Sequence, residues 1–310
     1  NMIYKHTQVN FTGEFKILEG LKIKQVVALQ PIDNMSSKFV KDIQYYDQNG
    51  GEGPKQGINN LTVYNFQSER LTFQTLLTYD KKIGKHQFNL LGGFMDETFR
   101  ADYSSAYAQG FLNHDFPELN LGSRDGMKVD GGAKKLILRS FFGRINYAFA
   151  DKYLVEANVR RDGTSRFLGN NRWSTFPSFS AGWRISQEDF SKESALADGI
   201  SELKLRGGWG KLGNQQLSAT SDNLYPTGDA FYPGIFTITP GFNYPFGTKP
   251  SSGGATVQSA NPLLRWEATT STNIGLDLNL KNNLGFVFEY FDRGTDGVLL
   301  KLPVSELYGL

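Results

Sequence analysis

The chain has 310 residues, no cysteine and a formal net charge of +2 at pH 7. The missing cysteine excludes a disulfide scaffold, thiol catalysis and cysteine-type zinc sites, and a near-neutral charge without a basic block argues against nucleic acid as the main partner. Mean hydropathy is −0.39, and the chain lacks the run of about 18 apolar residues that marks a transmembrane helix. A membrane-spanning β-barrel stays compatible, because its strands place lipid-facing residues only at every second position.

Two pairs of strands are predicted in residues 1–135. Apolar and polar residues alternate in segments 7–17, 21–29, 70–79 and 88–94. Strict period 2 is typical of β-strands with one apolar and one polar face. Within each pair the connection is a compact turn, near 18–20 and near 80–85. Segments 31–60 and 100–135 are rich in Gly, Asn and Asp, and we expect them to be long polar loops.

The most regular alternation lies in residues 138–185. Three alternating runs follow one another here, 140–149, 153–160 and 178–185. A short turn at residues 150–152 joins the first two, and a polar loop at 161–172 joins the last two. Runs of roughly ten residues favour the wall of a transmembrane barrel over a soluble β-sandwich, whose strands usually have about 5–6 residues.

The remaining residues add three strands and a short helix. The strands are expected at 203–209, 273–280 and 286–290, with a turn at 281–283 and a long irregular segment at 211–262. Residues 186–197 are expected to hold a short helix with Ser186 as its N-cap.

The sequence thus predicts about ten strands, and the connections between them fall into two classes, short turns and long loops. Short turns alternate with the four loops, as in outer-membrane barrels that have short periplasmic turns and long extracellular loops. The connection at 186–200 is the exception, being long on the short side. The fold class predicted is all-β, a transmembrane antiparallel β-barrel.

Other kinds of site find little support. Residues 208–213 fit Gly-x-Gly-x-x-Gly, but no helix follows to hold a dinucleotide, so strand glycines are the better interpretation. The histidines are isolated and no Gly-x-Ser-x-Gly is present, which argues against a transition-metal centre or a hydrolase. Asp115, Asp125 and Asp130 lack EF-hand spacing, so solvated loop acids are favoured over a calcium site. We expect no enzyme activity, no cofactor and no metal.

Charged and amide residues gather on the polar faces of the predicted strands. A charge costs roughly 2–4 kcal/mol on the lipid face of a barrel at the midplane, so these side chains should face the lumen. They would pair there with one another or with an occluding domain, or they would contact cargo directly. The residues are Arg144, Asn146, Glu156, Asn158, Arg160, Arg184, Lys204 and Arg206.

Eight stretches together resemble one protein family. They are SFFGRINY (140–147), DKYL (151–154), RDGTSRF (161–167), FPSFSAGWRI (176–185), ISELKLR (200–206), WGKLGN (209–214), NPLLRWE (261–267) and TNIGLD (272–277). Their order and spacing are similar to those of the SusC/RagA-type TonB-dependent transporters of Bacteroidetes outer membranes.

The resemblance implies a multi-pass barrel of about 22 strands in the outer membrane, occluded by an N-terminal plug. It also implies active import of a large nutrient, an oligosaccharide or an oligopeptide. The implied partners are a SusD-like surface lipoprotein, the TonB complex, outer-membrane lipid and a second SusC–SusD pair.

The chain departs from the complete family pattern. It shows no plug domain, no TonB-contacting segment and no C-terminal closing strand, and about ten strands cannot close so wide a barrel. We therefore expect residues 1–310 to be a portion of one barrel domain of a longer protein. A passive or structural barrel, such as a porin or adhesin, and a soluble carbohydrate-binding β-protein are the alternatives.

The segment 211–262 carries a group of aromatic residues. Aromatic rings stack on sugar faces and anchor peptides, so a role in binding cargo is one hypothesis. Packing within the loop or contact with the lipoprotein is the equal alternative. The residues are Tyr225, Phe231, Tyr232, Phe236, Phe242 and Tyr244.

Overall fold

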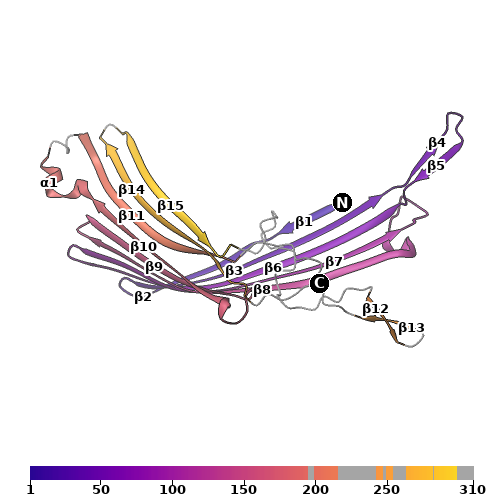
Figure 1. The fold of residues 1–310 in the computed structure, drawn as a ribbon, viewed down its shortest axis with the longest axis horizontal. Helices are drawn as coiled ribbons and strands as arrows, with labels where there is room; N and C mark the ends of the chain where they lie inside the picture. The colour runs from indigo at the N-terminus through magenta and orange to yellow at the C-terminus, as the bar shows by residue number, and fades with distance from the viewer. Residues whose placement is uncertain (195–198, 216–241, 247–248, 254–262, 282, 299–310) are drawn as a thin grey trace, which may run out of the picture. The chain divides into compact units, whose positions relative to one another are not determined.

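A computed structural model describes residues 1–194, 199–215, 242–246, 249–253, 263–281 and 283–298 (Figure 1). The strands are β1 (Met2–His6), β2 (Val9–Leu18), β3 (Leu21–Val40), β4 (Ile43–Tyr46), β5 (Glu52–Gln56), β6 (Asn60–Ile83), β7 (His86–Gln109), β8 (Ser123–Phe149), β9 (Tyr153–Thr164), β10 (Trp173–Arg184), β11 (Ile200–Asn214), β12 (Phe242–Phe246), β13 (Lys249–Gly253), β14 (Glu267–Leu280) and β15 (Gly285–Asp296). The helical elements are short: η1 (Leu119–Leu121), η2 (Gly169–Arg172), η3 (Ile185–Gln187) and α1 (Asp189–Lys192).

Eleven strands form one sheet, in the order β1-β3-β6-β7-β8-β9-β10-β11-β14-β15, with β2 also paired to β3. β4 with β5 and β12 with β13 form two separate hairpins. Among the described residues the sheet is open, since its order ends at β1 and β15. The described helical turns are all too short and too polar to be membrane-spanning helices. The all-β fold and the expected number of barrel strands are confirmed.

The chain divides into two compact units. The first comprises residues 1–11, 26–73 and 97–136, and the second comprises residues 12–25, 74–96 and 137–310. In the first unit Leu61, Ala108 and Phe111 form a buried cluster. In the second, Phe167, Phe176 and Trp266 do so, with edge-to-face ring contacts at 5.7 and 5.4 Å from Trp266.

The expected loop at 31–60 is wrong in extent. β3 continues to Val40, β6 begins at Asn60, and the β4/β5 hairpin occupies much of the interval. Pro31 is accommodated within β3 because its carbonyl accepts the Thr7 N–H at 3.1 Å, where the pairing with β1 ends. Strands held by main-chain hydrogen bonds alone need no alternation of apolar and polar residues, so the sequence does not show where β3 ends.

The expected loop at 100–135 is also shorter than predicted. β7 runs to Gln109 and β8 begins at Ser123, leaving 110–122 as the connection. The first residues of β8, 123–133, are exposed on both faces. A strand that meets water on both faces needs no apolar face, and the Gly and Asp residues of this segment make its sequence look like a loop.

The other two loops and the helix need smaller corrections. β9 runs to Thr164 and β11 to Asn214, and the β12/β13 hairpin interrupts the segment expected to be irregular. Residues 216–241 of that segment lie outside the described residues. The short helix is present, but its N-cap is Glu188 rather than Ser186, and no side chain caps it.

The four short turns are confirmed. Three contain a residue with positive φ that suits Gly or Asn: Gly20 (81°), Gly84 (58°) and Asn283 (68°). In the β8–β9 turn Ala150 and Asp151 have φ of 53° and 56°, and the Lys152 N–H donates to the Phe149 carbonyl at 2.9 Å. Two successive positive φ values are typical of type I′ hairpin turns, which match the twist of the strands.

Candidate functional site

The eight predicted lumen residues share one face of strands β8 to β11. Residues directly opposite one another in a ladder, and residues two apart along a strand, lie on the same face. The register pairs Asn158 with Arg144 on β8 and with Ser178 on β10, and it pairs Gly182 of β10 with Arg206 of β11. Even-numbered residues of the paired segments 138–149, 153–164, 173–184 and 202–214 therefore lie on this polar face. That the polar face lines a lumen stays a prediction.

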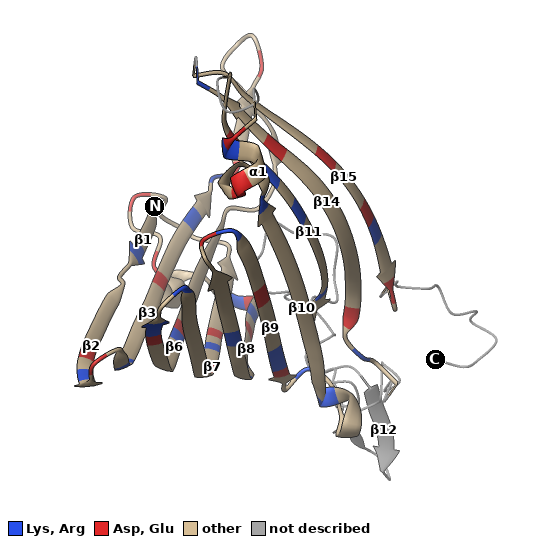
Figure 2. Ribbon diagram, turned by 90° about the vertical axis from the view of Figure 1, so that its left-hand side faces the viewer, with Lys and Arg blue, Asp and Glu red and all other residues tan. Residues whose placement is uncertain are grey.

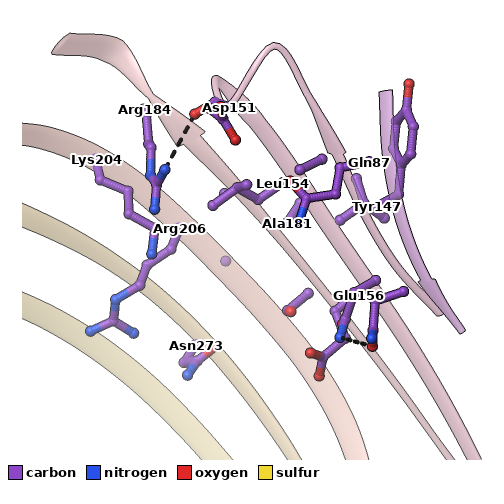
Figure 3. A pocket seen from close by; sticks show the side chains of 17 residues that line it. Gln87, Tyr147, Asp151, Leu154, Glu156, Ala181, Arg184, Lys204, Arg206 and Asn273 are labelled. Atoms are coloured by element: carbon purple, nitrogen blue, oxygen red, sulfur yellow. Dashed lines mark hydrogen bonds between the residues drawn. The ribbon is translucent and has the colours of Figure 1, made fainter. Parts of the chain in front are cut away.

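A hollow of about 580 Å³ opens on the polar face (Figure 3). Its lining comes from β7 to β11 and β14, and it includes five of the eight predicted residues, namely Asn146, Glu156, Arg184, Lys204 and Arg206. Arg144, Asn158 and Arg160 lie on the same face but outside the hollow. The structure thus brings together side chains that are up to 60 residues apart in the chain, from Asn146 to Arg206.

The charge of the hollow is uneven. Arg184 and Lys204 are cross-strand partners, and Arg206 follows on the same margin (Figure 3). Among the described residues, the Arg184 Nη1 donates to the Asp151 carbonyl alone, at 3.5 Å, and its Nε is buried without a hydrogen-bond partner. Like charges directly opposite repel one another. The margin formed by Arg184 and Lys204 is therefore suited to an anionic group.

Arg206 differs from these two cations because carboxylates hold it. Its Nε lies 3.2 Å from Asp277 Oδ1 on β14, and its Nη1 lies 3.1 Å from Glu289 Oε1 on β15. A Cβ added to Gly275, the cross-strand partner of Arg206, would lie 2.7 Å from the guanidinium carbon. Glycine at 275 thus leaves room for an ion pair that ties three strands together. Figure 2 shows basic positions on β11 and acidic positions on β14 and β15.

Arg160 has a second network at the far end of β9. Its Nε donates to both Asp162 oxygens at 2.8 and 2.9 Å, and its Nη2 donates to Ser140 Oγ at 2.8 Å. The guanidinium lies 5.2 Å from the centre of the Phe142 ring. Sequence reasoning missed Asp162 because it placed this residue in a loop; continuing the even-numbered series of β9 finds it.

The opposite face of the same strands is apolar and exposed. Odd-numbered residues of β8 to β11 and even-numbered residues of β14 and β15 lie on it. Ile145 is 53% exposed and Ile274 is 58% exposed. Further large apolar side chains on this apolar face with exposed surface are Phe141, Val159, Phe179, Leu205, Trp209, Phe286, Phe288 and Tyr290. Water is an unfavourable neighbour for so large an apolar surface.

Two groups of aromatic rings mark the two ends of the apolar face. Where β10 begins, Phe141 of β8 lies between Phe94 of β7 and Trp173 of β10, with ring centroids 5.2 and 6.1 Å apart. Near the turn end, Tyr153 stacks between Phe149 and Trp183 at 6.3 and 6.5 Å. Aromatic girdles of this kind flank the apolar band of outer-membrane barrels.

At the turn end, Glu188 collects hydrogen bonds outside the strands. The Lys152 Nζ donates to Oε2 at 2.9 Å and the Trp183 Nε1 donates to Oε1 at 3.1 Å. Hydrogen bonds from Tyr153, Lys152 and Trp183 lower the pKa of Glu188 to about 2. The carboxylate therefore ties the β8–β9 turn to the segment after β10.

Acidification is expected to loosen this tie. Because the folded-state pKa of Glu188 lies below its ordinary value of 4.5, the stabilisation is present above pH 4.5 and is lost as the pH falls towards 2. Unfolding of the full-length protein in detergent should need less urea at pH 3 than at pH 6, and Glu188→Gln should weaken this dependence. Glu193→Gln is the control, since Glu193 is exposed and its side chain makes no hydrogen bond or ion pair with the described residues. An unchanged pH dependence in Glu188→Gln would contradict the assignment.

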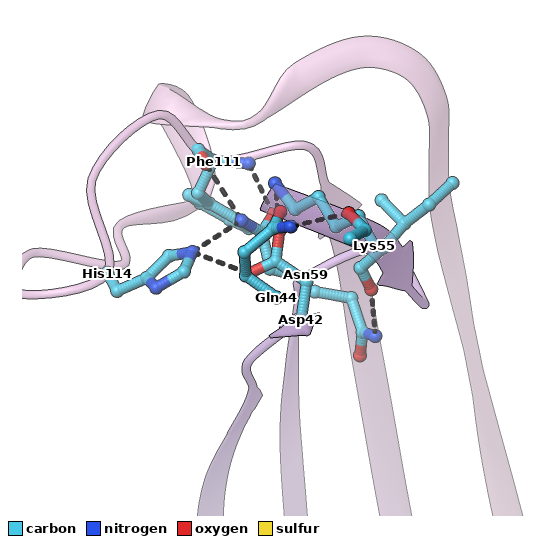
Figure 4. Close-up of polar contacts among 9 residues, drawn as sticks. Asp42, Gln44, Lys55, Asn59, Phe111 and His114 are labelled. Atoms are coloured by element: carbon cyan, nitrogen blue, oxygen red, sulfur yellow. Dashed lines mark hydrogen bonds and ion pairs between the residues drawn. The ribbon is translucent and has the colours of Figure 1, made fainter. Parts of the chain in front are cut away.

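A polar cluster in the first unit ties loop 110–122 to neighbouring segments (Figure 4). Asp42 pairs with Lys55 of β5 and with His114 Nε2 at 2.9 Å, and the Asn59 Nδ2 lies 2.8 Å from the same nitrogen. Asn59 also donates to the Phe111 carbonyl at 2.8 Å and accepts the Phe111 N–H. The hydrogen bond from Lys55 lowers the pKa of Asp42. No sequence pattern predicts this cluster, because its members come from two separate connections between long strands.

The predicted aromatic cargo site is mostly outside the described residues. Tyr225, Phe231, Tyr232 and Phe236 lie there, within 216–241. Phe242 and Tyr244 belong to β12, where their backbones pair with Gly253 and Ser251 of β13. The role of all six stays a prediction. The sequence 208–213 lies within β11, which confirms that its glycines are strand residues.

A family model and curated relatives identify the same protein family. The family model described as "TonB dependent receptor-like, beta-barrel" matches residues 4–307. TonB-dependent receptor P39 of Formosa agariphila is 30% identical over 312 residues, and TonB-dependent receptor SusC of Bacteroides thetaiotaomicron is 32% identical over 267 residues. The chain spans 28% of the length of the first and 24% of the second, while 100% and 84% of the chain are covered.

A solved structure of the RagAB peptide transporter has the same fold. It superimposes with a TM-score of 0.81 at 22% identity, covering 100% of this chain and 32% of that chain. A second structure, described as the RagAB peptide importer in an open-open state, superimposes with a TM-score of 0.80.

Proposed function

Because the chain belongs to the TonB-dependent receptor-like β-barrel family, we propose that it forms part of the wall of an outer-membrane transporter that imports a large nutrient. The observation that carries the proposal is the division of the sheet into two faces. One face exposes large apolar side chains, and the other carries ion pairs and a polar hollow. A sheet with these faces suits a wall between lipid and an aqueous lumen.

The spacing of the two aromatic groups supports this orientation. Tyr153 belongs to the aromatic group at the turn end, and Arg161 is the cross-strand partner of Phe141 in the other aromatic group. The segment of β9 from Tyr153 to Arg161 has nine residues. A transmembrane strand needs about 9–11 residues. The turns at 150–152 and 281–283 would then face the periplasm, and loop 165–172 would face the exterior. The polar hollow would lie inside, with its cationic margin towards the periplasmic half.

The cargo we propose is an oligosaccharide or an oligopeptide, carried with a SusD-like lipoprotein and driven by the TonB complex. The matched SusC and RagAB proteins support this class of system. The polar lining of the hollow and the aromatic residues of 211–262 fit cargo that bears many hydrogen-bonding groups. A dimer of SusC–SusD pairs is part of the same proposal.

Energy dependence separates this proposal from a passive barrel. Uptake of candidate oligosaccharides and oligopeptides is measured in cells that express the full-length protein, with and without a functional TonB complex. We expect uptake to require the TonB complex. Uptake that continues at the same rate without it would identify a porin, and a protein that leaves the membrane fraction without detergent would identify a soluble binding protein.

Deleting residues 225–244 tests the role of the aromatic segment. We expect reduced cargo uptake if the rings bind cargo, and reduced co-purification of the lipoprotein if they contact the lid. Both quantities are measured on the same strain, with membrane yield as the control for assembly. Normal uptake together with normal co-purification would dismiss both roles.

A further inference from the structure

An exposed arginine lies at the outer margin of the apolar face. Arg161 of β9 pairs with Phe141 of β8 and with Thr175 of β10, so it shares the face with Phe141. Its guanidinium carbon lies 5.7 Å from the centre of the Trp173 ring, and the side chain has no carboxylate partner among the described residues. A cation held over an aromatic ring at the margin of an apolar surface is positioned for an anionic group.

A second arginine stands next to it on the same face. Arg139 of β8 pairs with Gly163, which makes it a diagonal neighbour of Arg161 within reach of a long side chain. Arg139 contacts Asp96 Oδ2 at 2.6 Å and lies 6.0 Å from the centre of the Phe94 ring. Two guanidinium groups with one carboxylate leave the cluster with one net positive charge.

Glycine at 163 makes this arrangement possible. A Cβ added there would lie 2.6 Å from Trp173 Cδ2, so the indole ring occupies the space above Gly163. The ring therefore fills the position between the two arginines and supports Arg161. The result is an apolar platform, made by Phe94, Phe141 and Trp173, with the cations Arg139 and Arg161 at its outer margin.

We propose that Arg139, Arg161 and Trp173 bind the phosphate-bearing headgroup of a lipid in the outer leaflet. The inference rests on the proposed function, because the apolar face must contact lipid. Phosphate accepts hydrogen bonds from two guanidinium groups, and its charge matches the excess cation. The platform contacts the acyl chains below the headgroup, as interfacial aromatic residues do. A free anion would gain nothing from the platform, so we assign the site to a lipid.

Native mass spectrometry of the full-length protein, extracted in detergent, tests the site with bisphosphorylated lipid A as the probe. We expect wild type to retain lipid A, and Arg161→Gln to lower the bound fraction about fivefold, with a further loss in the Arg139→Gln double variant. Dephosphorylated lipid A should bind wild type as weakly as bisphosphorylated lipid A binds the double variant. Arg144→Gln is the matched control on the polar face of β8 and should retain lipid A.

Three results would overturn the proposal. They are unchanged lipid A binding in Arg161→Gln, equal binding of dephosphorylated lipid A, and displacement of lipid A by inorganic phosphate at equal concentration. Membrane yield and TonB-dependent uptake are measured for the same variants. A variant that assembles and imports but shows no headgroup dependence contradicts the lipid site alone, whereas wild type that fails to enter the membrane contradicts the proposed function.

Discussion

Ile145→Arg is expected to abolish assembly of the full-length protein in the outer membrane, while Asn146→Arg, one residue further along β8, is expected to assemble. Ile145 is 53% exposed on the apolar face. A charge there costs about 2–4 kcal/mol near the midplane of a bilayer. Asn146 lies on the polar face opposite Glu156, so an arginine at 146 gains an acidic neighbour. Adjacent positions should thus give opposite results.

Membrane yield and resistance of the folded band to SDS without heating measure this effect. Phe141→Arg and Val155→Arg should behave like Ile145→Arg, and Arg144→Ala should behave like Asn146→Arg, because the register assigns them to the same two faces. Equal yields for the two groups would contradict the assignment of the faces. The soluble alternative predicts little difference between the two groups, since a charge on an exposed surface costs little in water.

Arg206→Ala has the second largest expected effect, a loss of about 1–3 kcal/mol in the free energy of unfolding. The change leaves Asp277 and Glu289 next to each other without the cation that holds both. The side chain of Arg206 is 29% exposed, so the loss should be smaller than for a fully buried pair. Urea unfolding of the full-length protein in detergent measures it.

A triple variant separates the ion pair from simple loss of packing. Adding Asp277→Asn and Glu289→Gln to Arg206→Ala should recover part of the lost stability, because the uncompensated carboxylates are gone. Lys204→Ala is the control, a neighbouring cation on the same strand and face without a carboxylate contact in the described part of the chain. Equal losses in Arg206→Ala and Lys204→Ala would show that the network contributes nothing specific.

The long strands of the barrel wall could be predicted because their two faces meet two different environments. Where one face meets an apolar and the other a polar environment, period 2 appears in the sequence, and the segments 140–149 and 153–160 show it. The register of β8 with β9 then follows from the turn at 150–152, and with it the shared face of Arg144 and Asn158. The motifs within these strands also carried the family resemblance.

The outer part of β8 could not be predicted in this way. Where both faces meet water, backbone hydrogen bonds hold the strand, and any polar sequence satisfies them. The segment 123–133 therefore looks like a loop and folds as part of a strand. The same reason hides the Asp42–Lys55–His114 cluster, because connections between strands carry no periodic signal.

By itself the sequence determined the fold class, the two faces and the positions of the tight turns, because alternation and turn residues depend on neighbours along the chain. Only the tertiary structure decided which side chains contact one another. Arg206 meets Glu289 across 83 residues, Arg161 lies over Trp173, and five of the eight predicted polar residues line one hollow. These contacts depend on strand register and on the space left by glycines such as Gly163 and Gly275, and both are properties of the assembled sheet.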